Sequence, residues 1–455
     1  MTAWSSNLAE ALQVRPGQVK PGIVRGRLRV PPSKSVSHRQ LALALLARSP
    51  VEVRNLLRAE DIDLFLAALR AMGWTVEERA ERDDAGDGSR TVRLAPGSPP
   101  GEATLECGNA GTLMRFLVAL AATVPGAWTL DGTARLRERP VGPLVAALQA
   151  LGVAVTWHGR AGFPPLTVAG HTFRGGETTI DAGESSQYLS ALLLAALGAQ
   201  QPTRVRVTAL TSAPYVDVTL QLIARWGGRV EASAGAFVVT PGLRPPRVDA
   251  DVDVEVEGDY SAAAYPAAAA ALTGGEVTLR GLRRDSAQGD REFLEVLRRM
   301  GAEVSWRGDE LQVAGGGALT AVDVDMGSMP DQVPTLAALA PFARGTTAIR
   351  NVPHLRIKES DRLAAMAREL GRAGAVVEER ADGLVIPGVW ADVALAALPR
   401  TPVSVDPHGD HRIAMSMALV GLRRPGLRIA HPEVVAKSYP RFWDDLATLR
   451  TEDAP

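Results

Sequence analysis

Hydrophobic and polar positions along the chain follow a pattern that returns about every 75 residues. Two apolar residues three positions apart are followed by a glycine and then by a strand-like stretch, and this pattern occurs five times. It predicts a helix with an apolar last turn, a glycine in the left-handed conformation that ends the helix, and a strand. The five glycines are Gly73, Gly152, Gly227, Gly301 and Gly374.

A second pattern occurs six times and consists of a polar cluster, an Ala/Leu-rich helix, a turn and a short strand. Strands that alternate with two helices in each copy predict an α/β fold. The sixth copy ends after a helix near residues 443–449, so we expect the N-terminal segment 19–30 to supply its missing strand. The six polar clusters begin at Ser33, Asn109, Ser185, Asp259, Asp331 and Asp410.

Six copies in two groups of three predict two domains, as does a length of 455 residues. We expect a discontinuous domain of residues 1–32 and 258–455, a continuous domain of residues 33–257, and a hinge near residues 32 and 257. Residues 1–14 are predicted to form an extra amphipathic tail, and residues 242–253 a surface linker.

Charge and composition exclude several classes of protein. The net charge is −1, without the basic excess of a duplex-binding protein, so we expect no nucleic-acid partner. No apolar run reaches the roughly 18–20 residues of a membrane span. Cys107 is the only cysteine, which excludes an intramolecular disulfide. We predict a cytoplasmic enzyme that is a monomer.

The predicted helix starts carry cations that helix capping does not require. Lys34, Arg39, Arg115 and Arg412 fall in or near first turns, where a positive charge opposes the helix dipole. Capping explains the Ser, Asn and Asp residues there, but not these cations. A bound anion would reverse the penalty, because helix N-termini present free N–H groups to it. The pattern therefore predicts a ligand with several negative groups.

Lysine usage indicates where an ammonium group is needed. Of 50 lysines and arginines only four are lysine, so most surface positions that need a cation use arginine. Three of these lysines lie in motif-like settings, where we expect a compact, titratable ammonium group that a planar guanidinium cannot replace, whereas Lys20 is explained by codon usage alone. Lys358 lies in such a setting beside Glu359 and Arg362, which together are expected to perform acid–base chemistry. The four lysines are Lys20, Lys34, Lys358 and Lys437.

These residues belong to sequence motifs that are known from one enzyme family. PPSKSxSxR at residues 31–39 and GNAGTxxR at residues 108–115 resemble the two best-known signatures of 5-enolpyruvylshikimate-3-phosphate synthases. Further motifs follow in the family's order over about residues 25–445, among them SSQ at 185–187, KESDR at 358–362 and DHR at 410–412. The chain is therefore similar to the enolpyruvyl transferases.

The resemblance implies a fold and a reaction. The fold has two domains, each of three βαβαββ units, in an inverse α/β barrel-like arrangement. The reaction moves the enolpyruvyl group of phosphoenolpyruvate to the 5-hydroxyl of shikimate 3-phosphate by addition and elimination, without a metal or an organic cofactor. Gly111 is retained, which predicts inhibition by glyphosate. We expect helix starts that are distant in the sequence to surround both substrates in one cleft.

The resemblance also implies roles for individual residues. Asp331 is the base on the hydroxyl, and Glu359 with Lys34 exchanges the proton at C3. The residues implied for shikimate 3-phosphate are Lys34, Ser35, Arg39, Ser185, Ser186, Gln187, Ser212, Tyr215, Asp331, His354 and Lys358. Those implied for phosphoenolpyruvate are Lys34, Gly111, Arg135, Gln187, Arg362, Arg412 and Lys437.

Two positions depart from the family pattern, and three alternatives compete with it. His354 replaces a common asparagine and Phe116 a common proline. A related transferase that uses UDP-N-acetylglucosamine depends on a cysteine in a mobile loop, whereas we expect Cys107 to be a buried strand residue. A non-catalytic repeat scaffold would need no cation clusters. His408 and His411 alone form a weak metal-binding motif.

Overall fold

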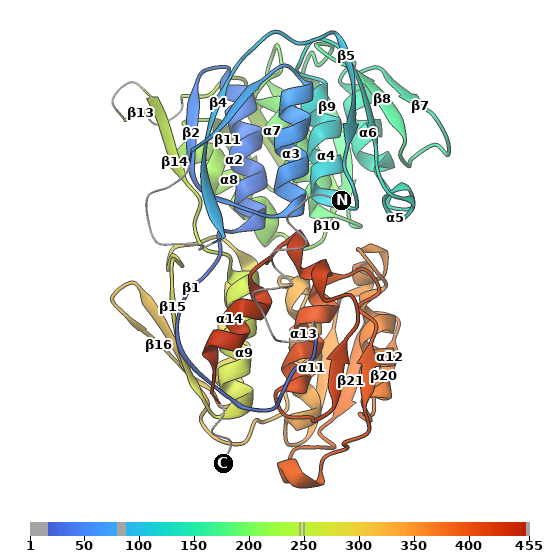
Figure 1. Ribbon diagram of the computed structural model, residues 1–455. Helices are drawn as coiled ribbons and strands as arrows, with labels where there is room; N and C mark the ends of the chain where they lie inside the picture. The colour runs from blue at the N-terminus through green and yellow to red at the C-terminus, as the bar shows by residue number, and fades with distance from the viewer. Residues whose placement is uncertain (1–16, 80–87, 245–246, 249–250, 452–455) are drawn as a thin grey trace. The chain divides into compact units, whose positions relative to one another are not determined.

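The computed structural model describes residues 17–79, 88–244, 247–248 and 251–451. They form two compact domains (Figure 1). The first domain consists of Pro31–Asp259 and Arg283–Gly289, and the second of Met1–Val30, Tyr260–Leu282 and Asp290–Pro455, as far as these are described. The predicted tail at residues 1–14 lies outside the described residues.

The first domain contains three repeats, and each repeat combines strands with two or three helices. The first comprises β14 (Asp251–Glu255), α2 (Lys34–Ala47), β2 (Val51–Leu57), α3 (Glu60–Ala71), β3 (Thr75–Arg79) and β4 (Ser89–Ala95), with β13 (Arg247–Val248) at the sheet edge. The second comprises β5 (Glu102–Glu106), α4 (Gly111–Ala121), β6 (Ala127–Asp131), α5 (Ala134–Arg137), α6 (Gly142–Ala150), β7 (Val155–Trp157) and β8 (Leu166–Ala169). The third comprises β9 (Gly176–Ala182), α7 (Ser186–Ala196), β10 (Thr203–Leu210), α8 (Pro214–Arg225), β11 (Arg229–Ser233) and β12 (Ala236–Thr240).

The second domain contains the other three repeats. The fourth comprises β1 (Ile23–Arg29), α9 (Tyr260–Thr273), β15 (Glu276–Arg280), α10 (Phe293–Arg299), β16 (Glu303–Arg307) and β17 (Glu310–Ala314). The fifth comprises β18 (Asp323–Asp325), η2 (Pro330–Gln332), α11 (Val333–Leu339), β19 (Thr346–Arg350), η4 (Pro353–Ile357), α12 (Arg362–Arg372), β20 (Glu378–Arg380) and β21 (Gly383–Pro387). The sixth comprises β22 (Val403–Val405), α13 (His411–Gly421), β23 (Leu427–Ile429), η6 (Pro432–Lys437) and α14 (Phe442–Leu449), followed by β24 (Arg450–Thr451).

Strand pairing follows one rule in the first five repeats. The first strand of each repeat pairs in parallel with the second, the fourth pairs antiparallel with the second, and the third lies outside the fourth. In the second, third and fifth repeats a helix connects the two parallel strands, whereas in the first and fourth the paired strands lie far apart in the sequence. This arrangement is the βαβαββ unit, and it confirms the predicted α/β fold.

The origin of two strands differs from the prediction. The N-terminal strand β1 does not complete the sixth repeat; it pairs in parallel with β15 of the fourth, with Arg25 opposite Glu276. The sixth sheet contains only β22 and β23 among the described residues. The predicted linker at 242–253 was also wrong in part, because β14 pairs in parallel with β2. The sequence pattern identifies strands, but their partners are decided by long-range hydrogen bonding.

The helix-ending glycines confirm the first sequence pattern. All five have positive φ angles, from 67° at Gly227 to 105° at Gly301. An added Cβ at Gly73 would lie 2.4 Å from the Ser98 carbonyl oxygen, so the backbone also packs too closely there for a side chain. Glycine therefore ends these helices for conformational reasons and, at Gly73, for steric reasons as well.

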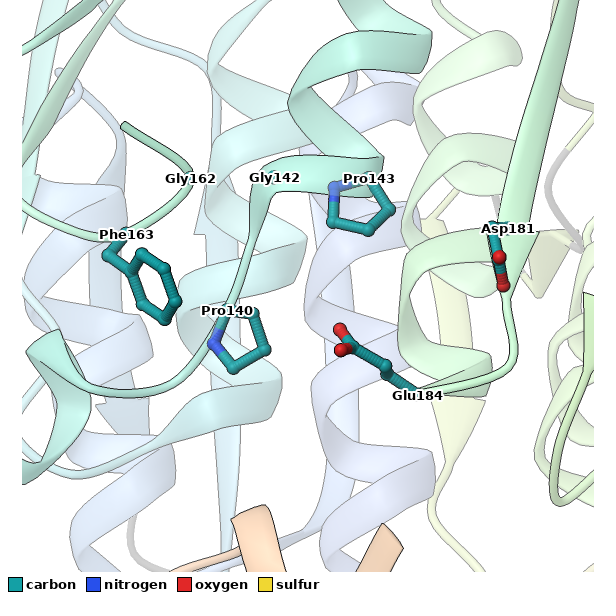
Figure 2. A pocket seen from close by; sticks show the side chains of 7 residues that line it. All are labelled: Pro140, Gly142, Pro143, Gly162, Phe163, Asp181 and Glu184. Atoms are coloured by element: carbon teal, nitrogen blue, oxygen red, sulfur yellow. The ribbon is translucent and has the colours of Figure 1, made fainter. Parts of the chain in front are cut away.

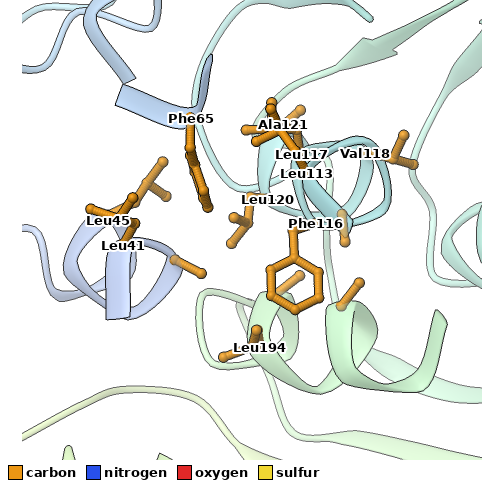
Figure 3. Packing of buried hydrophobic residues seen from close by; sticks show 14 of the residues in the cluster. Leu41, Leu45, Phe65, Leu113, Phe116, Leu117, Val118, Leu120, Ala121 and Leu194 are labelled. Carbon is orange, nitrogen blue, oxygen red and sulfur yellow. The ribbon is translucent and has the colours of Figure 1, made fainter. Parts of the chain in front are cut away.

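Each domain places its central helices inside and its sheets outside. Helices α9 and α13 are buried along their whole length, and α4 and α7 at all but one residue. In the first domain Phe65, Phe116 and Leu194 meet between helices of all three repeats (Figure 3). Each domain therefore has its own hydrophobic core, in which the apolar faces of its central helices are removed from water.

Candidate active site

The start of α2 carries the lysine that the sequence singled out. Ser33 caps the helix by accepting a hydrogen bond from the Val36 N–H, and the Lys34 N–H donates to Asp259 at 3.0 Å. The Lys34 Nζ lies 3.3 Å from a carboxylate oxygen of Asp61, whose side chain is only 3% exposed. Asp61 lies in the first turn of α3 and was not predicted. The ammonium group is therefore held by a buried carboxylate.

Arg39 lies one turn further along α2 and is buried among neutral acceptors. Its guanidinium donates to the Thr219 hydroxyl at 2.7 Å and to the carbonyl oxygens of Ser35 and Tyr215, each at 2.8 Å. No carboxylate forms an ion pair with Arg39 among the described residues. Burial lowers the pKa of Arg39 to about 10. A ligand anion nearby would stabilise this guanidinium.

The starts of α4 and α7 are joined through Gln187. Its side-chain oxygen accepts a hydrogen bond from Arg115 at 2.7 Å, and its amide donates to the Thr112 hydroxyl at 2.8 Å. Ser185 caps α7 by accepting from the Gln187 N–H, and Ser186 beside it is buried. Two predicted helix starts therefore lie together in the first domain. Asn109, in contrast, does not cap α4, which begins without a side-chain cap.

Arg139, which was not assigned to the site, lies against Gly111. A Cβ at Gly111 would approach the guanidinium atoms of Arg139 to 2.3–2.8 Å. Arg139 is buried and donates to the Asn109 carbonyl oxygen at 3.1 Å. The predicted Arg135 is more exposed and pairs with Glu138 at 2.8 Å. Glycine at 111 therefore allows a second arginine to pack flat on the start of α4.

The remaining predicted residues of the first domain lie at the start of α8. Ser212 is buried with a φ of 50°, and the Tyr215 carbonyl oxygen is the acceptor for Arg39. Phe116, the departure noted in α4, is buried with its ring 5.4 Å from the Arg39 guanidinium carbon. Helices α2, α4, α7 and α8 thus contribute to one cluster.

In the second domain, Arg362 at the start of α12 binds three carboxylates. Its Nε donates to Asp410, one Nη to Asp331 and the other to Glu359, each at 2.8 Å. The Arg362 side chain is 2% exposed and that of Asp410 is fully buried. Burial opposes its charge, but Asp410, Glu359 and Asp331 together raise the pKa of Arg362 above its ordinary value. The guanidinium is therefore permanently charged and fixed.

Asp331 lies between two arginines. Its second oxygen accepts from Arg412 at 2.6 Å. Burial would raise the pKa of Asp331, but Arg412, Arg362 and Lys358 outweigh it, and the pKa falls well below its ordinary value. The carboxylate is therefore ionised, and its side chain is still 22% exposed.

His354 and Lys358 lie near this cluster and act on its charges. Burial and then Lys358 lower the pKa of His354 to about 4, so its imidazole is neutral at pH 7. Lys437, at the end of η6, is buried with 7% of its surface exposed. Asp410 caps α13 by accepting a hydrogen bond from the Arg412 N–H at 2.9 Å. Asp331 lies in η2 and caps no helix, contrary to the capping explanation.

Other features of the described residues lie apart from these clusters. A cavity of about 320 Å³ in the first domain has walls formed by Pro140, Phe163, Asp181 and Glu184 (Figure 2), and no predicted site residue lines it. Cys107 is fully buried, as predicted, but it follows the end of β5 and lies in no strand. Among the described residues, no three His, Cys, Asp or Glu side chains are arranged so that they could hold a metal ion, and no helix has the length and apolar character of a membrane span.

Comparisons with known proteins identify the family of the whole chain. The family model described as EPSP synthase (3-phosphoshikimate 1-carboxyvinyltransferase) matches residues 19–446. A 3-phosphoshikimate 1-carboxyvinyltransferase of Syntrophobacter fumaroxidans is 45% identical over 433 residues, which cover 94% of this chain and 98% of the relative. One from Shewanella sp. (strain ANA-3) is 41% identical and covers 94% of this chain and 97% of its own.

A solved structure extends the likeness to the fold. The EPSP synthase of Acinetobacter baumannii superimposes with a TM-score of 0.76 at 26% identity, over 96% of this chain and 98% of that one. The match covers both domains and all six repeats. The chain belongs to the EPSP synthase family of transferases.

Proposed function

We propose that the chain transfers the enolpyruvyl group of phosphoenolpyruvate to the 5-hydroxyl of shikimate 3-phosphate, releasing phosphate. The observation that carries this proposal is the ionised Asp331 carboxylate, held by Arg362 and Arg412 in a cluster that also contains Glu359. Two anion-binding arginines beside fixed carboxylates suit a reaction that moves protons next to a phosphorylated carboxylate.

The first domain is proposed to bind shikimate 3-phosphate. Arg39 is a buried cation with neutral partners, and the start of α7 presents the hydroxyls of Ser185 and Ser186. Helix N–H groups, hydroxyls and a guanidinium are the donors that phosphate and carboxylate oxygens prefer. Gln187, Ser212 and the other residues predicted for this substrate stay assigned to it as predictions.

The second domain is proposed to supply the proton-transfer carboxylates. In the first step the 5-hydroxyl oxygen attacks C2 of phosphoenolpyruvate, its proton passes to Asp331, and C3 receives a proton from Glu359 or Lys34. In the second step C3 returns a proton and the C2–O bond to phosphate breaks. A charged tetrahedral intermediate lies between the two steps, and fixed cations stabilise it.

The pairing of Asp331 makes it a weak base until an anion arrives. Arg362 and Arg412 both bind it, and they hold its pKa low. An anionic substrate that shares these guanidinium groups offsets their charge, which raises the pKa of Asp331 and makes it a stronger proton acceptor. Substrate binding would thereby activate the base.

Phosphate release tests the proposed function directly. The purified full-length protein is incubated with phosphoenolpyruvate and shikimate 3-phosphate in the presence of a chelator, and phosphate is measured. We expect release only when both substrates are present. Release with UDP-N-acetylglucosamine instead would assign the chain to the related transferase. Inhibition by glyphosate that competes with phosphoenolpyruvate is expected as well.

The Lys34→Arg variant is a further test of this function. A guanidinium keeps the charge but does not fit the single 3.3 Å contact of an ammonium with the buried Asp61. We expect kcat to fall by about 10³-fold, the size of a lost proton-transfer group. Lys20→Arg is the matched control and is expected to leave kcat unchanged.

Location in the cytoplasm and a monomeric state remain part of the proposal.

A further inference from the structure

Glu369 is a fully buried carboxylate on α12, two turns beyond Arg362. Its side chain has no exposed surface, and its oxygens accept hydrogen bonds from the Asp406 N–H at 3.2 Å and from Arg372 at 3.0 Å. The Nε2 of His408 lies 3.2 Å from its other oxygen. A buried carboxylate is tolerated only where such partners satisfy its oxygens. Two of these three partners belong to one loop, residues 406–410.

The loop at 406–410 has a fixed and unusual backbone. His408 adopts a φ of 52°, a backbone conformation that residues other than glycine rarely take. Its N–H donates to the Asp406 carboxylate at 2.8 Å, and the Asp410 N–H donates to the Pro407 carbonyl oxygen at 2.9 Å. The loop is therefore held by its own hydrogen bonds and by Glu369.

The far end of this loop is Asp410, which organises the charged cluster. Asp410 accepts hydrogen bonds from Arg362 at 2.8 Å and from the Arg412 N–H at 2.9 Å. Helix α12 therefore holds the loop at two points, through Arg362 near Asp410 and through Glu369 near His408. Two attachments fix the direction in which α13 begins, and with it the Arg412 guanidinium that binds Asp331.

We propose that Glu369 and His408 form a positioning pair that aims Arg412 for substrate binding. The His408 ring faces a carboxylate from each nitrogen, Glu369 at 3.2 Å and Asp406 at 3.7 Å. Glu369 and His408 are not among the carboxylates and arginines of the charged cluster, so they act on it through Asp410 and Arg412. The inference rests on the proposed function, because it names residues that prepare the same site.

Steady-state kinetics of the His408→Phe variant test the pair. Phenylalanine keeps the ring but donates no hydrogen bond to Glu369, so the loop loses one attachment. We expect KM for phosphoenolpyruvate to rise about tenfold, the effect of one lost hydrogen bond to a charged group. Both kcat and KM for shikimate 3-phosphate should stay within about threefold of the wild type. His408→Gln keeps an N–H donor and should restore most of the affinity.

Two further variants separate positioning from general stability. His171 also has a left-handed φ, 60°, but lies exposed in a loop of the first domain, so His171→Phe carries a similar backbone cost and should leave all constants unchanged. If the pair acts as a unit, adding Glu369→Gln to His408→Phe should raise KM no further than the more severe single variant.

The outcomes distinguish the inference from the function beneath it. A His408→Phe variant that melts at a lower temperature but keeps the wild-type KM for phosphoenolpyruvate would overturn the positioning role, as would a His408→Gln variant no better than Phe. The His408 variants alone decide the question if Glu369→Gln does not fold. A wild-type protein that releases no phosphate would refute the proposed function instead.

Discussion

Two buried arginines, Arg39 of the first domain and Arg362 of the second, are held in opposite ways. In the first domain Arg39 donates to a hydroxyl and to carbonyl oxygens, and burial lowers its pKa to about 10. In the second domain Arg362 donates to three carboxylates, and its pKa rises in spite of burial. The first arrangement lacks negative charge among its described partners, whereas the second carries its own. A cation without a counter-charge is prepared for a ligand anion, and a neutralised cluster is prepared for proton transfer.

The largest expected effect comes from removing charge in the second domain. Asp331→Asn keeps the shape but not the carboxylate, so kcat should fall about 10³-fold, as for the loss of a general base. Affinity for shikimate 3-phosphate, to which Asp331 is also assigned, should fall far less than kcat, and calorimetry can measure it. Asp323→Asn alters an exposed ion pair with Arg350 and is the matched control. Wild-type kcat in Asp331→Asn would remove Asp331 from the mechanism.

A pair of arginine variants tests the comparison itself. Arg362→Met removes the guanidinium that three carboxylates share and should lower the free energy of unfolding by about 3–5 kcal/mol. Arg39→Met should change it by less than about 1 kcal/mol, because the removal of an uncompensated buried charge offsets the lost hydrogen bonds. Affinity for shikimate 3-phosphate should nevertheless fall about 10–100-fold in Arg39→Met.

Urea unfolding measures the free energies of the two variants. Arg350→Met, on an exposed ion pair, is the control and should cost less than about 0.5 kcal/mol. Equal destabilisation by Arg39→Met and Arg362→Met would show that the two arginines are held alike, and the comparison would then be wrong.

Acid stability sharpens the comparison through one histidine in each domain. Burial lowers the pKa of both His38 and His354 to about 4, against about 6.5 in the unfolded chain. The unfolded state therefore binds more protons below pH 6.5, so stability is complete above that pH and falls as the pH drops toward 4. His354→Asn should remove about 3 kcal/mol of this loss at pH 4. Urea unfolding between pH 7 and 4 gives the slope, and an unchanged slope would contradict the prediction.

The smallest expected effect concerns Gly111. A methyl group there would lie 2.3–2.8 Å from the Arg139 guanidinium, which must move. We expect Gly111→Ala to raise KM for phosphoenolpyruvate about fivefold and to weaken inhibition by glyphosate, consistent with one displaced charged group. Gly371→Ala, inside α12 with open space around it, is the control and should stabilise the protein by about 1 kcal/mol. An unchanged KM in Gly111→Ala would show that Arg139 has no part in binding.

Local sequence determined the repeats, the helix ends and the cations at the helix starts. Gly73, Gly301 and their counterparts end helices because the left-handed conformation is a property of the residue itself. Ser33, Ser185 and Asp410 cap helices because a cap needs only neighbouring N–H groups. These interactions span a few residues, so a motif is enough to predict them.

Only the tertiary structure decided which strands pair and which charges neutralise one another. The partner of β1 is β15, although the repeat pattern suggested the sixth repeat. Asp61 beside Lys34, Arg139 over Gly111 and Glu369 behind Asp410 come from other helices or loops and leave no local signal. Burial and ion pairing depend on atoms that folding brings together. The same carboxylate is solvated in one place and holds a buried cation in another, according to where the folded chain places it.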